Sequence, residues 1–141
     1  MKKGFSFVEV ITIVAILGIL AVVTIPSYTR WAQSYYLKEE AQRLNDAIKK
    51  TQSMVVTGQK GYYIEFAPDK EEYYIKDAND IMKEGFKLRS DITFLQINIT
   101  DYKIHFTNLG IPDHPGTIVL ENRIGQTKTI EVTPSGFVKI Y

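Results

Sequence analysis

The first 25 residues constrain the fold more than any other part of this chain. From Phe5 to Ile25, 16 of 21 residues are apolar, and Glu9 is the single charged residue. As a helix, this run would span roughly 32 Å, enough to cross a bilayer core of about 30 Å. Lys2 and Lys3 precede the run. Because basic residues stay on the cytoplasmic side, we expect a cytoplasmic N-terminus and a head on the far side of the membrane.

The pattern alone leaves three interpretations of this segment open. A cleaved secretory signal peptide would explain the basic start, but the run is long for one and Ile25-Pro26-Ser27-Tyr28 is a poor cleavage site. A plain membrane anchor would explain the length. Neither explains Glu9, because a carboxylate costs up to about 2–3 kcal/mol at the membrane centre. Glu9 is therefore a candidate functional residue, unless it simply lies among the lipid headgroups.

The residues around Glu9 favour a functional role. The stretch Lys3-Gly4-Phe5-Ser6-Phe7-Val8-Glu9-Val10, followed by the apolar run and Pro26, resembles the N-terminus of type IV prepilins. That family includes major and minor pilins and the pseudopilins of type II secretion systems. The shared pattern is a short basic leader ending in Gly, an aromatic residue, a Glu four residues further on and a hydrophobic helix. The resemblance covers residues 2 to about 31.

The resemblance implies a role for each matching residue. Gly4-Phe5 would be the bond cut by the prepilin peptidase, and Phe5 would become the N-methylated terminus. Glu9 would pair with the terminal amine of a neighbouring subunit; a paired amine and carboxylate cost less in lipid than either alone, so a wrong stagger is penalised. Pro26 would bend or loosen a helix that continues, although from its position alone it could equally end the membrane helix.

Residues 27–57 change from all-apolar to amphipathic. Aromatic residues come first, where a membrane-interface belt would lie, at Tyr28, Trp31, Tyr35 and Tyr36. An apolar stripe at helical spacing follows: Leu37, Ala41, Leu44, Ile48, Thr51 and Val55. The opposite face is polar, with Lys38, Glu39, Gln42, Arg43, Asn45, Asp46, Lys49 and Lys50. This favours one helix from about Phe5 to about Val56, near 75 Å long and stopped at Gly58, packed on its own domain rather than in a coiled coil.

Residues 61–141 predict a head of about seven or eight antiparallel strands. The hydrophobic period becomes two, and turn residues separate the strands. We expect a hairpin of 62–66 with 73–76, strands near 86–89, 92–99, 103–106, 117–120, 129–132 and 137–141, and a short helix over Asp77–Glu84. The fold class is therefore α+β, with a long N-terminal helix packed on an antiparallel sheet. The expected segments are a leader (1–4), a membrane and assembly half of the helix (5–26), an amphipathic half (27–57) and the head (61–141).

The order of the last strands is similar to that of the GspH/FimT group of minor pseudopilins and minor pilins. The residues that carry this similarity are Phe106, Gly110, Pro115-Gly116-Thr117-Ile118, Ile130-Glu131-Val132 and Ser135-Gly136-Phe137-Val138. The absence of Cys disfavours the major pilins that carry a C-terminal disulfide.

The sequence offers little for catalysis, so we expect no enzyme and no cofactor. With no Cys and two His, it lacks a thiolate nucleophile and a Cys- or His-rich metal site. His105 should face outward on a strand, Asp113 and His114 belong to a rigid turn, and Asp77-Ala78-Asn79-Asp80 only loosely suggests a calcium loop. We expect no catalytic residue and no metal site.

The sequence-based conclusion is a minor pilin or pseudopilin that is inserted in the bacterial inner membrane and then assembled into a fibre. The expected partners are other pilins or pseudopilins, the prepilin peptidase and membrane lipid, with a place at or near the fibre tip that helps to initiate assembly. An alternative is a minor pilin whose head binds DNA, a surface or secreted cargo. Residues 27–141 hold 15 basic and 15 acidic residues, so the overall charge does not favour DNA.

Overall fold

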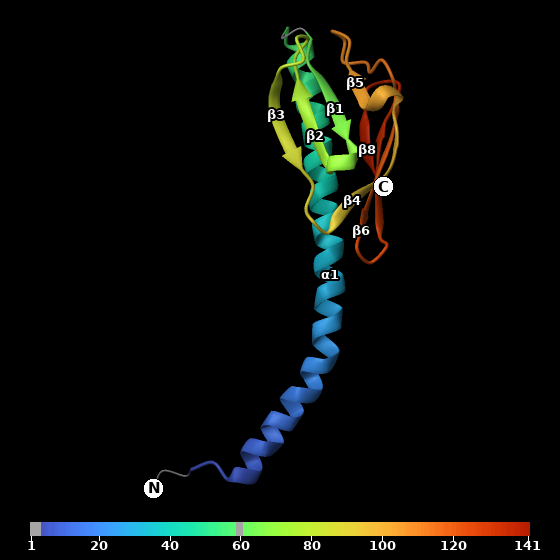
Figure 1. Ribbon diagram of the computed structural model, residues 1–141. Coiled ribbons are helices and arrows are strands. Elements are labelled where there is room, and N and C mark those ends of the chain that lie inside the picture. The colour runs from blue at the N-terminus through green and yellow to red at the C-terminus, as the bar shows by residue number, and fades with distance from the viewer. Residues whose placement is uncertain (1–3, 59–60) are drawn as a thin grey trace.

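One long helix and two four-stranded antiparallel sheets make up residues 4–58 and 61–141, the part of the chain that this computed structural model describes (Figure 1). The helix, α1, spans Phe7–Val56. Its lower half stands free of the head and its upper half runs along the head. The prediction of one continuous helix packed on an antiparallel β head, an α+β architecture, is confirmed.

Strands that follow one another in the chain do not all belong to the same sheet. Sheet A has the order β3-β2-β1-β5, and sheet B has the order β4-β6-β7-β8. The strands are β1 (Tyr63–Ala67), β2 (Glu72–Lys76), β3 (Met82–Lys87), β4 (Ile92–Asn98), β5 (Lys103–His105), β6 (Gly116–Asn122), β7 (Thr127–Val132) and β8 (Val138–Ile140). Two short 3-10 turns, Pro68–Lys70 and Thr100–Tyr102, link β1 to β2 and β4 to β5. The predicted hairpin is β1–β2, with Tyr63 opposite Lys76 and Ala67 opposite Glu72.

The predicted apolar stripe is the face of α1 that packs on the sheets. All six of its side chains are at most 3% exposed: Leu37, Ala41, Leu44, Ile48, Thr51 and Val55. They meet fully buried residues of both sheets, including Ile64 and Ile104 of sheet A and Ile118, Leu120 and Ile130 of sheet B. The core therefore lies between the upper half of α1 and the two sheets, and none of the described side chains in the lower half of the helix belongs to it.

Two local predictions are wrong. Asp77–Glu84 is not a helix: Asp77 accepts hydrogen bonds from the backbone N–H groups of Asn79 and Ile81, which folds a tight turn, and β3 then pairs with β2. Such a local side-chain bond competes with helix formation. Asn45, assigned to the polar face, is only 4% exposed.

Gln52 ties the helix to the two loops at the end of the head furthest from the N-terminus. Its Nε2 donates to the carbonyl oxygens of Gly110, at 2.6 Å, and of Gly136, at 3.0 Å. Both glycines have a positive φ, of 77° and 84°, and a Cβ at Gly136 would collide with the Gly110 carbonyl oxygen. One side chain therefore holds both loops against α1.

Replacing Gln52 with Leu is expected to destabilise the head by about 1–3 kcal/mol, because two carbonyl groups lose their shared donor. Urea unfolding of the full chain in detergent measures the change. The matched control is Lys49→Leu, at an exposed position one turn away on the same helix. Equal losses of stability from the two substitutions would show that Gln52 does not hold the two loops against α1.

Glu40 is a buried carboxylate on the head side of α1. It is 2% exposed, and its Oε1 accepts a hydrogen bond from Nη1 of Arg43 at 2.9 Å. The guanidinium of Arg43 also lies over the Phe86 ring and donates to the Lys87 carbonyl oxygen, so Arg43 bridges α1 and β3. Burial raises the pKa of Glu40, and Arg43 offsets only part of that effect.

Glu40→Gln is expected to change the pH dependence of stability. Because the folded pKa of Glu40 lies above the ordinary value of 4.5, the folded chain binds this proton more tightly than the unfolded chain does. The contribution of Glu40 to stability therefore falls as pH rises through that interval. We expect the wild type to lose free energy of unfolding, relative to Glu40→Gln, as the pH rises above the ordinary pKa of 4.5. Urea unfolding at several pH values tests this, and a difference that does not vary with pH would contradict it.

Candidate assembly surface

The Gly4–Phe5 bond lies just outside the helix. Ser6 is the N-cap residue and α1 begins at Phe7. The Ser6 carbonyl oxygen accepts the first hydrogen bond of the helix, from the Val10 N–H at 3.2 Å, and Gly4 and Phe5 precede this cap. Nothing lies within 4 Å of the place where a Cβ on Gly4 would be, and Phe5 is 74% exposed. An extended, open segment of this kind can enter a protease cleft. Lys2 and Lys3 of the expected leader lie outside the described residues.

Glu9 lies in the first turn of α1, among exposed apolar side chains. Its neighbours Phe7 and Val8 are 78% and 69% exposed. Glu9 has no salt bridge to any of the residues that the structure describes. The positive end of the helix dipole favours a carboxylate at this position, but a cation from another molecule would be needed to neutralise it in lipid.

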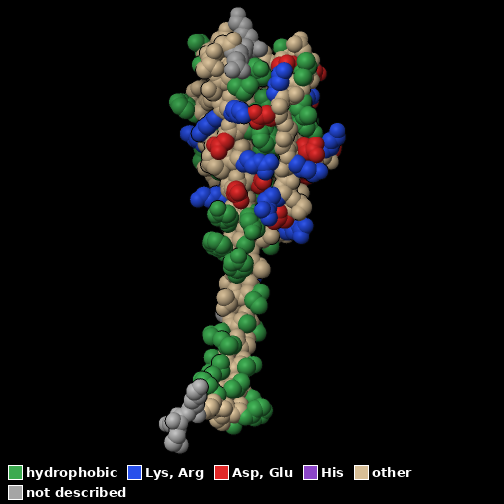
Figure 2. Space-filling view, turned by 90° about the vertical axis from the view of Figure 1, so that its left-hand side faces the viewer, with side chains coloured by type: hydrophobic (Ala, Val, Ile, Leu, Met, Phe, Trp, Pro, Cys, Tyr) green, Lys and Arg blue, Asp and Glu red, His purple; other side chains and the backbone are tan. Residues whose placement is uncertain are grey.

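The lower half of α1 packs against no other element in the described part of the chain. In its most apolar 18-residue window, none of the residues is buried, and the helix is long and apolar enough to cross a membrane. Its two threonines, Thr12 and Thr24, donate their hydroxyl hydrogens to the carbonyl oxygens of Val8 and Leu20 one turn earlier, each at 2.8 Å. Polar groups that are satisfied within the helix suit an apolar surrounding. Figure 2 shows hydrophobic side chains along this stalk and charged ones gathered on the head.

Pro26 lies inside α1 and does not end it. Proline has no N–H to donate to the carbonyl of residue 22, which weakens the helix at that turn. Thr29 Oγ1 donates to the Pro26 carbonyl oxygen at 2.9 Å. In Figure 1 the helix bends below the head, between its blue and cyan parts. The structure thus excludes Pro26 as a helix terminator; its role as a kink in a fibre stays a prediction.

Aromatic side chains form a stripe directly below the head. The ring centroids of Tyr28 and Trp31 are 6.1 Å apart, and those of Trp31 and Tyr35 are 5.7 Å apart and stacked. All three residues are more than half exposed. This is where an interfacial belt would meet the headgroups if the apolar run spans a membrane.

The histidines and Asp113, considered above as possible catalytic or metal-binding residues, make contacts with neighbouring groups of the head. Asp113 Oδ1 accepts hydrogen bonds from the backbone N–H groups of His105 and His114, at 3.0 and 2.8 Å. The exposed His105 ring stacks on Tyr63. Among the described residues, no three His, Asp or Glu side chains gather in a way that could hold a metal ion.

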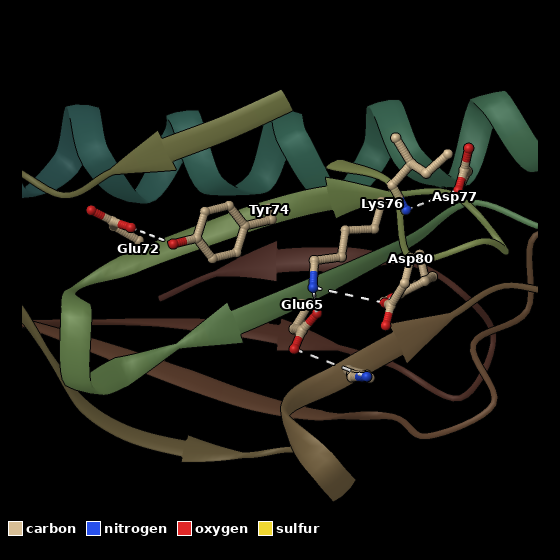
Figure 3. A network of polar contacts seen from close by, with 9 residues as sticks. Glu65, Glu72, Tyr74, Lys76, Asp77 and Asp80 are labelled. Atoms are coloured by element: carbon tan, nitrogen blue, oxygen red, sulfur yellow. Dashed lines mark hydrogen bonds and ion pairs between the residues drawn. The ribbon is translucent and has the colours of Figure 1, made fainter. Parts of the chain in front are cut away.

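The carboxylates of the candidate calcium loop belong to a surface network on sheet A (Figure 3). Asp77 pairs with Lys83 at 3.1 Å, and Asp80 accepts from the Tyr63 hydroxyl and lies 3.8 Å from Lys76. The Tyr63 hydroxyl, and then Lys76, hold the pKa of Asp80 below its usual value. Both carboxylates are thus neutralised by groups of the chain itself, so the fit to calcium is poor.

The basic side chains of the head are also largely paired. Lys50, Lys76, Lys83, Lys87, Arg89 and Lys103 each make an ion pair with a carboxylate. In Figure 2 the two signs of charge are interleaved over the visible face of the head. On this face, among the described residues, the pairing of opposite charges does not favour contact with a phosphate backbone.

Comparison with known proteins identifies the architecture. The chain is similar to the crystal structure of the type IV minor pilin FimU from Pseudomonas aeruginosa strain PAO1. The match covers 79% of this chain and 92% of the FimU chain, with a TM-score of 0.63 and 15% sequence identity. The chain has the type IV pilin fold. No protein-family model matches the sequence, and no curated protein matches it significantly. At this identity the likeness establishes the pilin fold alone, so the role of the chain in a fibre is argued below.

Proposed function

We propose that this chain is a minor pilin or pseudopilin, a structural subunit of a type IV pilus or a type II secretion pseudopilus. One observation carries the proposal: a 50-residue pilin-fold helix whose lower half exposes an apolar surface, with one unpaired carboxylate, Glu9, in its first turn. A surface of this kind needs lipid first and other subunits later. The similarity to a minor pilin, together with the absence of Cys, favours a minor subunit.

The proposed life of the subunit has two stages. In the inner membrane, the N-terminus faces the cytoplasm, the prepilin peptidase cuts Gly4–Phe5, and Phe5 becomes a methylated terminus. In the fibre, Glu9 accepts the amine of a neighbouring Phe5, and the lower half of α1 joins a helical bundle at or near the tip, where it helps to initiate assembly. The head, placed outside the membrane, supplies recognition rather than catalysis.

The proposal is tested by locating the chain in the organism that makes it. We expect the processed chain in the membrane and, at low abundance, in fibres sheared from the cell or overproduced at its surface. Deleting its gene should lower the number of fibres, and reintroducing the gene should restore it. Normal fibre number in the deletion strain, together with absence of the chain from purified fibres, would contradict the proposal.

A further inference from the structure

The turn between β6 and β7 is the part of the head that reaches furthest down toward the free lower half of α1 (Figure 1). Asn122, which is 4% exposed, holds this turn in place. Its Nδ2 donates to the Gln33 carbonyl oxygen of α1 at 3.3 Å, and its Oδ1 accepts from the backbone N–H groups of Ile124 and Gln126, at 3.2 and 2.9 Å. One buried side chain therefore fixes the turn beside Gln33 on the helix.

The level of Gln33 is close to a membrane surface if the apolar run Phe5–Ile25 crosses the bilayer. At about 1.5 Å per residue, Gln33 is about 12 Å beyond Ile25 along the helix. The tip of the turn, two residues beyond Asn122, extends up to about 7 Å back toward the membrane. A headgroup layer is about 5–8 Å thick, so the tip reaches the headgroups.

The residues at the tip of the turn suit a membrane surface. Arg123 and Ile124 are both exposed, Ile124 to 47%. Arg123 donates a long hydrogen bond, of 3.4 Å, to the Ser90 carbonyl oxygen, and no carboxylate of the described chain makes an ion pair with it. A guanidinium binds phosphate oxygens, and an adjacent aliphatic side chain can enter the boundary of the apolar layer.

A second arginine lies on the helix below the turn. Arg30 precedes the buried Leu37 by seven residues, or about two helical turns, so it lies on the side of α1 that carries the head. Arg30 is exposed and makes no ion pair within the described residues. Arg30 and Arg123 thus lie on the same side of the molecule, at its membrane-proximal end.

The charges at this end of the head favour an anionic surface. Three of the four arginines of the chain lie there, with two acidic residues, in segments 26–36, 88–93 and 121–126. Arg89 pairs with Asp91 at 3.2 Å, which leaves Arg30 and Arg123 against one further carboxylate. Residues 27–141 as a whole have no net charge, so the local excess of arginine is specific to this end.

We propose that the membrane-proximal end of the head binds phospholipid headgroups of the bilayer that α1 crosses, through Arg30, Arg123 and Ile124. The inference rests on the membrane stage of the proposed function and adds a lipid contact of the head itself. Two attachments, the helix and the turn, then fix the tilt of the head on the membrane. Entry into a fibre removes the subunit from the headgroups, so the contact orients the subunit only while it waits in the membrane.

Quenching of a fluorophore beside the turn tests the contact. The natural chain has no Cys, so Thr127→Cys, at an exposed position, carries the label, and Leu109→Cys at the far end of the head is the reference. Each full-length chain is inserted into vesicles of equal parts phosphatidylglycerol and phosphatidylcholine that contain a lipid with a nitroxide on its headgroup. We expect a large quenched fraction at residue 127 and little quenching at residue 109. Equal quenching at the two positions would overturn the inference.

Charge variants separate a lipid contact from proximity alone. Arg123→Gln and Arg30→Gln should each lower the ratio of quenched to unquenched label at residue 127 about fivefold, because a basic side chain beside anionic headgroups contributes about that factor. Arg123→Lys keeps the charge and should keep most of the quenching. Lys139→Gln, at an exposed position on β8, is the matched control and should leave the ratio unchanged. Equal ratios in Arg123→Gln and Lys139→Gln chains contradict the proposed contact.

The same chains separate this inference from the proposed function. A chain that resists carbonate extraction from the vesicles but is not quenched at residue 127 keeps the membrane stage and loses the head contact, whereas a chain that carbonate removes contradicts both. In the native cell, Arg123→Gln should enter fibres at the wild-type level, because the fibre does not use the headgroup contact. Loss of Arg123→Gln from fibres would assign Arg123 to a contact between subunits and would overturn the inference.

Discussion

Glu9→Val is expected to leave the chain in the membrane and to remove it from fibres. Membrane insertion should be unaffected or slightly improved, because an unpaired carboxylate among Phe7, Val8 and Val10 opposes insertion. In the fibre, the amine of the neighbouring Phe5 would lose its partner in an apolar bundle. At about 2.5–3 kcal/mol for an uncompensated charge, incorporation should fall about 100-fold. Quantitative immunoblots of membrane and sheared-fibre fractions measure both effects.

Thr12→Val is the matched control for Glu9→Val. It also replaces a polar side chain near the start of the same helix by valine, but the Thr12 hydroxyl bonds only to the Val8 carbonyl oxygen of its own helix. The control should enter fibres at close to the wild-type level. If Glu9→Val enters fibres as well as Thr12→Val does, Glu9 has no alignment role, and the exposed carboxylate is an incidental surface residue.

Leu44→Ala is expected to destabilise the head by about 2–5 kcal/mol. Leu44 is fully buried in the core between α1 and the sheets, and its truncation leaves a cavity there. The same substitution at Leu17, which is 59% exposed on the stalk, should leave the stability of the head unchanged. Urea unfolding of both full-length variants in detergent gives the comparison. A loss at Leu17 as large as that at Leu44 would mean that the stalk packs on the head, contrary to the structure.

The helix was the most predictable part of this fold. A period of 3.6 over residues 37–55 can only be satisfied by one buried face, and the six stripe residues are that face. The strands were predictable by alternation, but not their partners, because alternation shows which side of a strand is buried and not which strand lies beside it. The split into sheets A and B therefore emerged only from the structure.

The residues that link the elements were the least predictable. Glu71 has a positive φ of 55° between β1 and β2, its carbonyl accepts from the Leu88 N–H, and its carboxylate accepts from the Phe94 N–H at 2.8 Å. In the sequence, Glu71-Glu72 reads only as a solvated pair. Gln52 and Glu40 were likewise unremarkable polar residues of a helix, since nothing local shows that a loop or a strand will close over them.

The assembly surface divides in the same way. Gly4, Phe5, Glu9 and Pro26 were selected because the N-terminal stretch resembles that of type IV prepilins, and the structure adds that they lie on or before a helix whose lower half the head leaves free.

The N-terminal residue of the chain in its native membrane tests the central claim most directly. Intact-mass and peptide mass spectrometry of the membrane-extracted protein should show a chain that begins at Phe5 with a methylated amine, and a strain without prepilin peptidase should yield only the longer chain with residues 1–4. A Gly4→Glu chain should likewise stay unprocessed. A wild-type chain that still begins at residue 1 would be a plain anchor, and one that begins near Tyr28 would be a secreted protein after signal-peptide removal; either result contradicts the account.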